Sequence, residues 1–447
     1  MKKLLFNACL INESRRTDGY LVINDGVIAE VGEGMPSAEL MAACECRYDL
    51  SGMWVIPGVI DDQVHFRDPG LTWKGDMTSE SMAAVAGGVT SFMDMPNVNP
   101  QTTTLEALEA KYERAANVSL ANFSFFIGAT NDNIDTLMQV DYSKTCGVKA
   151  FLGSSTGNML VNNPESLERL FAEVPALIAV HSEDEAVIAA NKQRYIKLHG
   201  EDLPVGYHPL IRSEEACYVS TARAVERAKR CGTRLHVLHL STGRELSLFD
   251  NHKPLSEKRI TAEVCVHHLW FCDEDYARLG NAIKCNPAIK TAHDREMLRV
   301  GLKSGLIDIV ATDHAPHLPA EKQGSCLKAA SGMPLVQYSL VAMLEMARNG
   351  VFTAEQVVEK MCHAPAMLYR IDRRGFLRPG YHADITVVDP CAEFKVSADS
   401  ILSRCGWSPF EGVTFHSKVV KTFVNGNLVY DDGRINEGAK GKRLLFN

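Results

Sequence analysis

The sequence predicts an α/β fold, in which a (β/α)8 barrel of the TIM type carries a small β-sandwich domain formed by both termini. Two observations lead to this prediction. From Ile56 onward, short apolar runs alternate with amphipathic stretches, which is the pattern of βα units around a parallel sheet. Before and after this region, the chain is β-rich and carries turn signals such as Asn24-Asp25-Gly26 and Asn425-Gly426. The 447 residues suffice for both parts, because such a barrel takes roughly 250 residues.

Eight apolar runs in the central region are the candidate barrel strands. They end near His65, Met95, Gly128, Leu152, His181, Leu240, His267 and Thr312. Helices are expected between the strands and outside the barrel, over residues 105–116, 165–173, 214–229, 295–303, 335–349 and 353–369. Eight βα units predict a closed barrel, and the active site of such a barrel lies at the C-terminal ends of its strands.

The two ends of the chain are predicted to pair with each other. Their segments with strand character are residues 21–31, 383–389 and 418–430. An isolated hairpin is only marginally stable in water, whereas a shared sheet buries one face. We therefore divide the chain into a β-sandwich domain of residues 1–55 and 375–447 and a barrel domain of residues 56–374. The similar hexapeptides 2–7 and 442–447 suggest two terminal strands.

Composition and charge narrow the class of function. With 46% hydrophobic residues, the chain has the composition of a globular protein with a sizeable core. The net charge of -8 disfavours nucleic-acid binding, because no basic surface is available to neutralise phosphates. No apolar run approaches the roughly 18 residues of a membrane span. Thirteen scattered cysteines without a Cys-x-x-Cys pair predict neither a disulfide framework nor a zinc ribbon. We expect a cytoplasmic enzyme with a small-molecule substrate, and a homo-oligomer, with a dimer favoured.

Polar side chains at the ends of the predicted strands form the candidate site. Those with the chemistry of metal ligands are His65, Lys149, His181, His239 and Asp313. A single histidine in such a place is more often a hydrogen-bonded core residue than a ligand. Four histidine or carboxylate positions on separate strands instead favour a metal centre, because the barrel brings all strand ends to one rim.

Lys149 differs from the other candidates, because an ammonium group in an apolar strand is desolvated and its pKa falls from about 10.4. Its neutral amine can then add carbon dioxide and become a carbamate, an oxygen ligand able to bridge two metal ions. The alternative is a lysine paired with an aspartate or glutamate at the strand end.

The strand ends belong to short motifs spread over nearly the whole chain. They are Pro57-Gly58, His65-Phe66-Arg67-Asp68-Pro69-Gly70, Met95-Pro96-Asn97, Val148-Lys149, Val180-His181, Leu238-His239-Leu240-Ser241-Thr242, Cys285-Asn286-Pro287 and Thr312-Asp313-His314-Ala315-Pro316-His317. Together they resemble the motifs of cyclic amidohydrolases, and most of all those of the dihydroorotase family. The resemblance implies zinc-dependent, reversible hydrolysis of the cyclic amide of (S)-dihydroorotate to N-carbamoyl-L-aspartate in pyrimidine biosynthesis.

The resemblance also implies two zinc ions, bridged by a carboxylated Lys149 and a hydroxide. His65 and Asp313 would belong to the more buried metal, and His181 and His239 to the more exposed one. Zinc brings the pKa of bound water to about 7 and polarises an amide carbonyl. Asp313 would take the proton as general base and deliver it to the departing nitrogen as general acid.

Arg67 is the residue that indicates the substrate, because its planar guanidinium matches a carboxylate with two hydrogen bonds. Dihydroorotate carries such a carboxylate. The resemblance assigns its binding to Arg67 and Asn97, with His317 assisting, and assigns the contact with the ring amide to Asn286. The alternative for Arg67 is a surface salt bridge with Asp68.

Gln63 departs from the family pattern, which has His-x-His where this chain has Gln63-Val64-His65. An amide oxygen is a weaker zinc donor than imidazole. Gln63 can ligate through its oxygen or leave a gap for water, Asp61 or Asp62 can help, or the protein can hold mainly the more exposed metal. We expect a working enzyme with a weakened or altered buried site, holding one or two zinc ions.

Other polar residues are given smaller roles. His267 and His268 are expected to be structural or to support ligands, and His236 to pack outside the barrel or to cap a neighbour. Segment 153–157 lacks the Gly-Lys-Ser/Thr ending of a phosphate loop and is expected to lie beside the metals. The aromatic segment 407–410 is expected in the core or at a domain interface.

Two other functions stay open on the sequence alone. A hydantoinase or allantoinase would share the barrel and the bridging lysine, and Arg67 is the residue that discriminates against it. A catalytically impaired scaffold homologue is the other alternative, which Gln63 keeps open.

Overall fold

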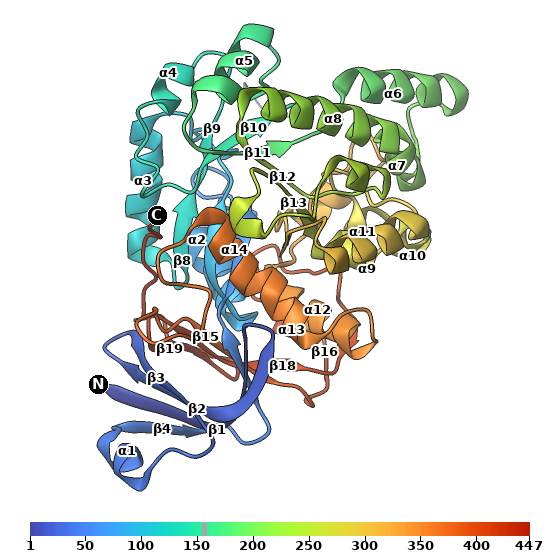
Figure 1. Cartoon of the computed structure of the whole chain (residues 1–447). Helices are drawn as coiled ribbons and strands as arrows, with labels where there is room; N and C mark the ends of the chain where they lie inside the picture. The colour runs from blue at the N-terminus through green and yellow to red at the C-terminus, as the bar shows by residue number, and fades with distance from the viewer. Residues whose placement is uncertain (154–158) are drawn as a thin grey trace.

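The computed structural model describes residues 1–153 and 159–447. Figure 1 shows a barrel of parallel strands surrounded by helices, and below it a sheet that contains the N-terminus. This arrangement confirms the predicted fold class, a TIM-type barrel with a β-rich part built by the two ends of the chain.

Eight parallel strands form the barrel, one of them built from two short consecutive strands, and each of the eight is called a stave below. In order they are β6 (Val59–Val64), β7 (Val89–Asp94), β8 continued by β9 (Asn122–Phe125 and Ile127–Gly128), β10 (Val148–Phe151), β11 (Leu177–His181), β12 (Arg234–Val237), β13 (Ile260–Cys265) and β14 (Ile309–Ala311). A parallel bridge between Val64 and His314 joins the last stave to the first and closes the ring. Every stave ends within three residues of its predicted end.

Helices cover the outside of the barrel (Figure 1). Those of ten residues or more are α2 (Met77–Ala86), α3 (Leu105–Val118), α5 (Pro164–Glu173), α6 (Glu185–His199), α8 (Glu214–Cys231), α11 (Ala292–Ser304) and α12 (Ser339–Arg348). Shorter helices are α1 (Ala38–Ala43), α4 (Ile134–Leu137), α7 (His208–Ile211), α9 (Val266–Trp270), α10 (Tyr276–Leu279), α13 (Ala354–Val358) and α14 (Ala364–Tyr369). The helix predicted over residues 353–369 is divided into α13, a π-helical turn (Glu359–His363) and α14, whose first turn contains Pro365. Proline has no amide hydrogen, so the regular helical ladder is interrupted there.

The two ends of the chain build one nine-stranded sheet. Its strands run in the order β20 (Arg434–Ile435), β19 (Asn427–Asp431), β18 (Lys418–Val424), β15 (Ile385–Asp389), β5 (Trp54–Pro57), β1 (Lys2–Asn12), β2 (Arg15–Asn24) and β3 (Val27–Glu33), with β4 (Cys46–Asp49) beside β1. The antiparallel pair β5 and β15 joins the N-terminal strands to the C-terminal ones. A separate pair, β16 (Phe394–Lys395) and β17 (Thr414–Phe415), completes the strands. The shared sheet is the pairing that the instability of isolated hairpins predicts.

The prediction of a last strand over residues 442–447 is wrong. Only Arg443 and Phe446 form isolated bridges, with Phe123 of the barrel and with Ile371. Figure 1 places the C-terminus beside α3, against the barrel and away from the sheet. The segment lies there because its buried residues Leu444 and Phe446 pack into the apolar cluster at the lower end of the barrel interior.

A layer of charged groups lies inside the barrel between this apolar cluster and the strand ends. Asp62, His236 and Glu263 are completely or almost completely buried, with His236 Nε2 3.4 Å from an Asp62 oxygen and 3.5 Å from a Glu263 oxygen. Tyr369 of α14 donates to Asp62 Oδ2 at 2.7 Å. Burial lowers the pKa of His236, but the two carboxylates outweigh it and raise that pKa to about 9. The imidazolium therefore balances negative charge within the barrel.

The prediction that His236 packs outside the barrel or caps a neighbour is therefore wrong. His236 is aligned with Ala179, and Ala179 with Lys149, so these three positions share the inner face. The prediction assumed regular alternation up to His239, but β12 ends at Val237 and His239 has a left-handed φ of 40°. None of the helices in the described ranges has the length and apolar character needed to cross a membrane.

Replacing Tyr369 with phenylalanine should destabilise the barrel. The change removes the donor to Asp62 and leaves a buried carboxylate oxygen without that partner, which costs about 1–3 kcal/mol. Urea unfolding followed by circular dichroism measures the loss. The control, Tyr195→Phe on α6, changes a partly exposed residue and should stay within about 0.5 kcal/mol. Equal midpoints for the two variants would contradict the importance of this contact.

Candidate functional site

The predicted site residues all line one pocket at the C-terminal ends of the strands. The pocket has a volume of about 920 Å³. The predicted residues in its wall are Gln63, His65, Arg67, Asn97, Lys149, His181, His239, Asn286, Asp313 and His317. The barrel thus brings residues that are far apart in sequence to a single rim, as its topology requires.

A pair of histidines on β11 and after β12 forms one side of the pocket. His181 Nδ1 lies 3.0 Å from His239 Nε2, and His181 Nε2 lies 2.8 Å from Glu183 Oε2. Arg212 in turn lies 3.1 Å from the same Glu183 oxygen. Burial lowers the pKa of His181 and takes that of His239 well below its ordinary value. Both rings are therefore neutral, and the carboxylate behind His181 provides the outer contact that metal-binding histidines usually have.

A second group of possible ligands surrounds Asp313. Its Oδ1 lies 3.0 Å from His65 Nε2 and accepts a hydrogen bond of 3.2 Å from the Gln63 amide nitrogen. The other ring nitrogen of His65 lies 2.8 Å from Asn97 Oδ1. Gln63 thus lies in the position of a ligand, but its side chain presents an amide donor to Asp313.

Lys149 is an amine buried among these groups. It is 1% exposed, and burial lowers its pKa to about 8 although Asp313 and Glu263 oppose the shift. The positive charge of Lys149 also lowers the pKa values of His181 and His239. The amine therefore interacts electrostatically with both groups of ligands. A substantial fraction of Lys149 is therefore neutral near pH 8, the form that reacts with carbon dioxide.

Three residues at the strand ends have left-handed backbone conformations. The φ angles are 65° for Arg67, 40° for His239 and 49° for Asp313. Residues other than glycine rarely adopt this region, and such strain concentrates at functional sites. The backbone here turns sharply so that these side chains enter the pocket.

Two cationic side chains, Arg67 and Lys74, also line the pocket. Arg67 Nη2 lies 3.1 Å from His317 Nε2, and Arg67 Nε donates to the carbonyl of Pro316 at 3.1 Å. Lys74 lies 3.2 Å from His317 Nδ1 and 2.7 Å from Glu321. Burial, together with these two cations, lowers the pKa of His317 to about 2, so the ring is neutral. Lys74 was not predicted, because a lysine in a polar loop has no distinctive pattern.

Asn286 enters the pocket on the side of α7. Its Oδ1 lies 3.1 Å from His208 Nε2, which also lies 2.8 Å from the carbonyl of Cys285. Burial takes the pKa of His208 well below its ordinary value, so this ring is a neutral donor. His208 and Glu183 were both missed from the sequence, since neither ends an apolar run at a barrel strand that would single it out.

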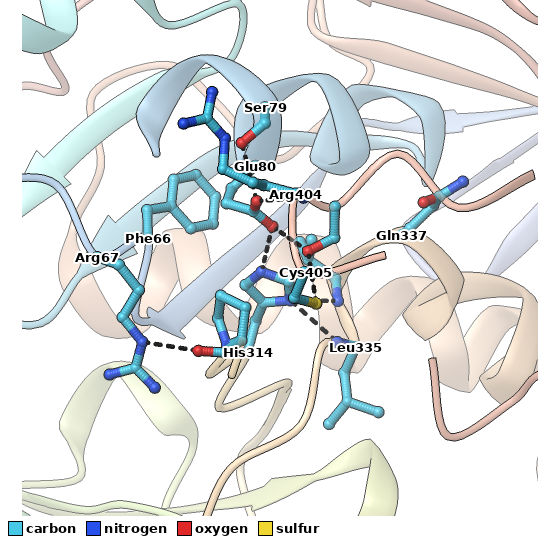
Figure 2. Close-up of polar contacts among 12 residues, drawn as sticks. Phe66, Arg67, Ser79, Glu80, His314, Leu335, Gln337, Arg404 and Cys405 are labelled. Atoms are coloured by element: carbon cyan, nitrogen blue, oxygen red, sulfur yellow. Dashed lines mark hydrogen bonds and ion pairs between the residues drawn. The ribbon is translucent and has the colours of Figure 1, made fainter. Parts of the chain in front are cut away.

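A buried glutamate holds the loop that carries Asp313 and His317. Figure 2 shows Glu80 of α2 facing His314 and the segment around Arg404 and Cys405. Glu80 lies 2.8 Å from His314 Nε2, and it accepts from Ser403 Oγ at 2.6 Å and from the Arg404 backbone at 2.9 Å. The C-terminal segment is thereby fastened to the pocket rim.

Trp407 strengthens the same attachment. Its indole nitrogen donates to the carbonyl of His317 at 2.7 Å, which places the predicted interface segment 407–410 against the pocket loop. For the predicted loop 153–157, residues 154–157 lie outside the described residues. His267 and His268 lie at the start of α9, beside Cys265.

The fold and the pocket define a barrel enzyme with a candidate metal centre at the strand ends. The model of the Amidohydrolase family matches residues 54–429, and the chain belongs to this family. Membership supports a hydrolase that acts on cyclic amides, and the family is typically metal-dependent.

Individual relatives carry several different names. A dihydroorotase from Methanosarcina acetivorans is 33% identical over 405 residues, which cover 88% of this chain and 84% of the relative. An allantoinase from Bacillus velezensis is 33% identical over 433 residues, with 95% and 93% covered. The solved L-hydantoinase (dihydropyrimidinase) from Arthrobacter aurescens has a TM-score of 0.90 and 27% identity, with 97% of each chain covered.

Replacing Glu80 with glutamine should loosen the pocket loop and destabilise the protein. The amide keeps the size of the side chain but turns one acceptor into a donor facing His314 and Ser403, a loss of about 1–3 kcal/mol. Thermal unfolding measures this loss. Glu113→Gln, on the exposed face of α3, is the matched control and should stay within about 0.5 kcal/mol. An unchanged midpoint for Glu80→Gln would show that the hydrogen bonds of Glu80 do not stabilise the pocket loop.

Proposed function

We propose that this protein is a dihydroorotase, which hydrolyses the ring amide of (S)-dihydroorotate reversibly to N-carbamoyl-L-aspartate in pyrimidine biosynthesis. The observation that carries the proposal is that Arg67 and Lys74 line the same pocket as the histidine and aspartate groups. A cationic end for a carboxylate and a hydrolytic end for an amide are what this substrate requires. Seven of the similar proteins, including the Methanosarcina acetivorans relative, bear this name at 30–33% identity.

The donor set fits zinc. His181 and His239 present facing nitrogens, and the contact of His181 with Glu183 fixes the ring for a ligand role. We assign these two residues to the more exposed metal, His65 and Asp313 to the more buried one, and a carboxylated Lys149 to both. When bound, one or two zinc ions would supply Lewis-acid polarisation of the amide carbonyl and a lowered pKa of water.

Gln63 makes the buried position the weaker one. Its amide nitrogen donates to Asp313, so its oxygen points away from the carboxylate that would share the metal. An amide oxygen is also a poorer zinc donor than imidazole. We therefore assign Gln63 at most a weak ligand role and expect higher occupancy at the position of His181 and His239.

Asp313 is the residue that we assign to proton transfer. Its carboxylate lies at the pocket wall, held between His65 and Gln63. It accepts the proton of the attacking water and delivers it to the ring nitrogen that leaves. Ring closure uses the same carboxylate in the reverse order, by microscopic reversibility.

The substrate carboxylate is assigned to Arg67, with Asn97 and His317 beside it. A neutral His317 that lies against Ser331 and Lys74 keeps Arg67 in place without competing for its charge. Asn286 faces the same pocket, and we assign it the contact with the ring amide. A cytoplasmic location and a homodimer remain predictions.

A hydantoinase or allantoinase is the second candidate, because an allantoinase and an L-hydantoinase are among the similar proteins. The cationic end of the pocket argues against it. A ring without a carboxylate would leave Arg67, which is 7% exposed, buried without an anionic partner in the complex. A catalytically impaired scaffold would show no turnover with any of these rings, so assays on purified protein with dihydroorotate, hydantoin and allantoin separate the three.

Replacing Arg67 with methionine should abolish most turnover of dihydroorotate. The loss of a buried, charge-assisted contact predicts a fall in kcat/KM of about 10²- to 10³-fold, measured from ring absorbance. Arg114→Met is the control, since Arg114 is half-exposed and pairs with Asp68 outside the pocket. Undiminished turnover in Arg67→Met would show that the carboxylate assignment is wrong.

Removing metal should abolish activity, and zinc should restore it. We expect the hydrolytic centre of the active protein to hold between about one and two zinc ions, and that of the Gln63→His variant to approach about two, because imidazole is the better ligand. Metal analysis of the same samples used for turnover provides the measurement. Full activity in protein stripped of metal would rule out the assigned centre.

A further inference from the structure

A second cluster of metal-binding side chains lies at the end of β13, beside the pocket. Cys265, His267 and His268 each offer a ligand atom, and these atoms lie within 4.8 Å of one another. The three residues are 0%, 0% and 3% exposed. None of them belongs to the ligand set that we assign to the hydrolytic centre.

The two imidazoles of this cluster are poorly satisfied. Among the described residues, His267 has at most a weak contact with the Thr312 backbone, and Nδ1 of His268 has no hydrogen-bond partner. His268 Nε2 donates to the carbonyl of Pro287 at 3.1 Å, which leaves Nδ1 as a lone pair. Buried polar groups without partners are costly, so each one in a native protein needs an explanation, and a bound ion is one such explanation.

The electrostatic environment of the cluster favours a cation. Burial takes the pKa of His267 well below its ordinary value, and the neighbouring His268 lowers it further, against a smaller opposing effect of the Thr312 backbone. The ring is therefore neutral, as metal binding requires. Burial and then the carboxylates of Glu263 and Asp313 raise the pKa of Cys265. The negative charges that raise this pKa would also attract a cation to the Cys265 sulfur.

Gln63 connects this cluster to the pocket. Its amide oxygen lies 3.9 Å from Cys265 Sγ, while its amide nitrogen faces Asp313. Gln63 lines the pocket and contacts the cluster, so its side chain lies between the two. The Gln63 oxygen is also a possible fourth ligand for a metal ion bound by the cluster. A histidine at position 63 would offer a ring nitrogen instead.

The other buried group of potential ligands does not need an ion. Asp62 and Glu263 lie on either side of His236, which is protonated, and burial raises the pKa of Glu263 to about 8, so this single positive charge does not face two full negative charges at neutral pH. The cluster at Cys265 has no such internal cation. The two groups therefore differ in charge balance, although both contain three possible ligands.

We propose that Cys265, His267 and His268 form a separate site for a divalent ion of the zinc type, with the Gln63 oxygen as a fourth donor. Zinc and cobalt suit a set of one thiolate, two imidazoles and one oxygen. On binding, the Cys265 sulfur loses its proton to solvent and donates an electron pair to the metal. The proposal does not depend on which cyclic amide the enzyme hydrolyses.

Titration of metal-stripped protein with Co²⁺ tests the site. Bound cobalt should develop a near-ultraviolet absorption from thiolate-to-cobalt charge transfer, because the hydrolytic ligand set contains no sulfur. Cys265→Ser should lose this absorption together with about one cobalt per chain, and His268→Asn should weaken binding at this site about tenfold or more. Cys272→Ser, which changes another buried thiol close by, should keep both.

X-ray absorption of the zinc-loaded wild type gives a test that does not depend on the folding of any variant. A sulfur neighbour at about 2.3 Å from zinc is expected. A spectrum without sulfur, or a cobalt band that survives in Cys265→Ser, would overturn the site. Dihydroorotate turnover of the same samples separates the two proposals, because a failed assay with an intact sulfur signal refutes only the proposed substrate.

Discussion

Closure of the barrel is the constraint on which the rest of the structure depends. The ring closes where Val64 bridges His314, and the next backbone hydrogen bond runs from His65 to the His314 carbonyl at 2.7 Å. This contact brings the start of the barrel against its end, so that Gln63 and His65 meet Asp313 although they are about 250 residues apart. Glu80 then fixes His314 from outside the ring (Figure 2). The geometry of the candidate centre therefore follows from the closure of the sheet.

The interior of the barrel separates apolar packing from chemistry. The apolar cluster at the lower end packs against α14, and above it Asp62, His236 and Glu263 balance one another. Buried ions cost several kcal/mol each unless they are paired and hydrogen-bonded, so such a layer persists only with its partners in place. Burial lowers the pKa of Lys149 to about 8, while Asp313 and then Glu263 and Asp62 of this layer favour the ammonium form and oppose the shift.

Much of the fold could be predicted, because barrel strands are apolar runs whose ends fall where polar residues begin. His65, His181 and Asp313 were found in this way, since each follows or ends such a run and the barrel topology does the rest. The failures concern tertiary contacts. His236 was placed outside because the strand ends before His239 and the alternation breaks there. Glu80, on the buried side of α2, has no local pattern that distinguishes it from an ordinary helical glutamate, and only the folded chain brings it to His314.

Gln63 contacts both Asp313 and Cys265, and the sequence could not show this. In the proposed metal centre, Gln63 stands where the family pattern has a histidine and would be the weaker ligand. In the folded chain, its nitrogen orients the carboxylate of Asp313 and its oxygen faces Cys265. A neutral imidazole has one donor and one acceptor in a rigid ring, whereas the amide places both on one short planar end. The single side chain of Gln63 therefore orients the carboxylate of Asp313 and contacts the neighbouring cysteine, which one imidazole ring at this position would not do in the same way.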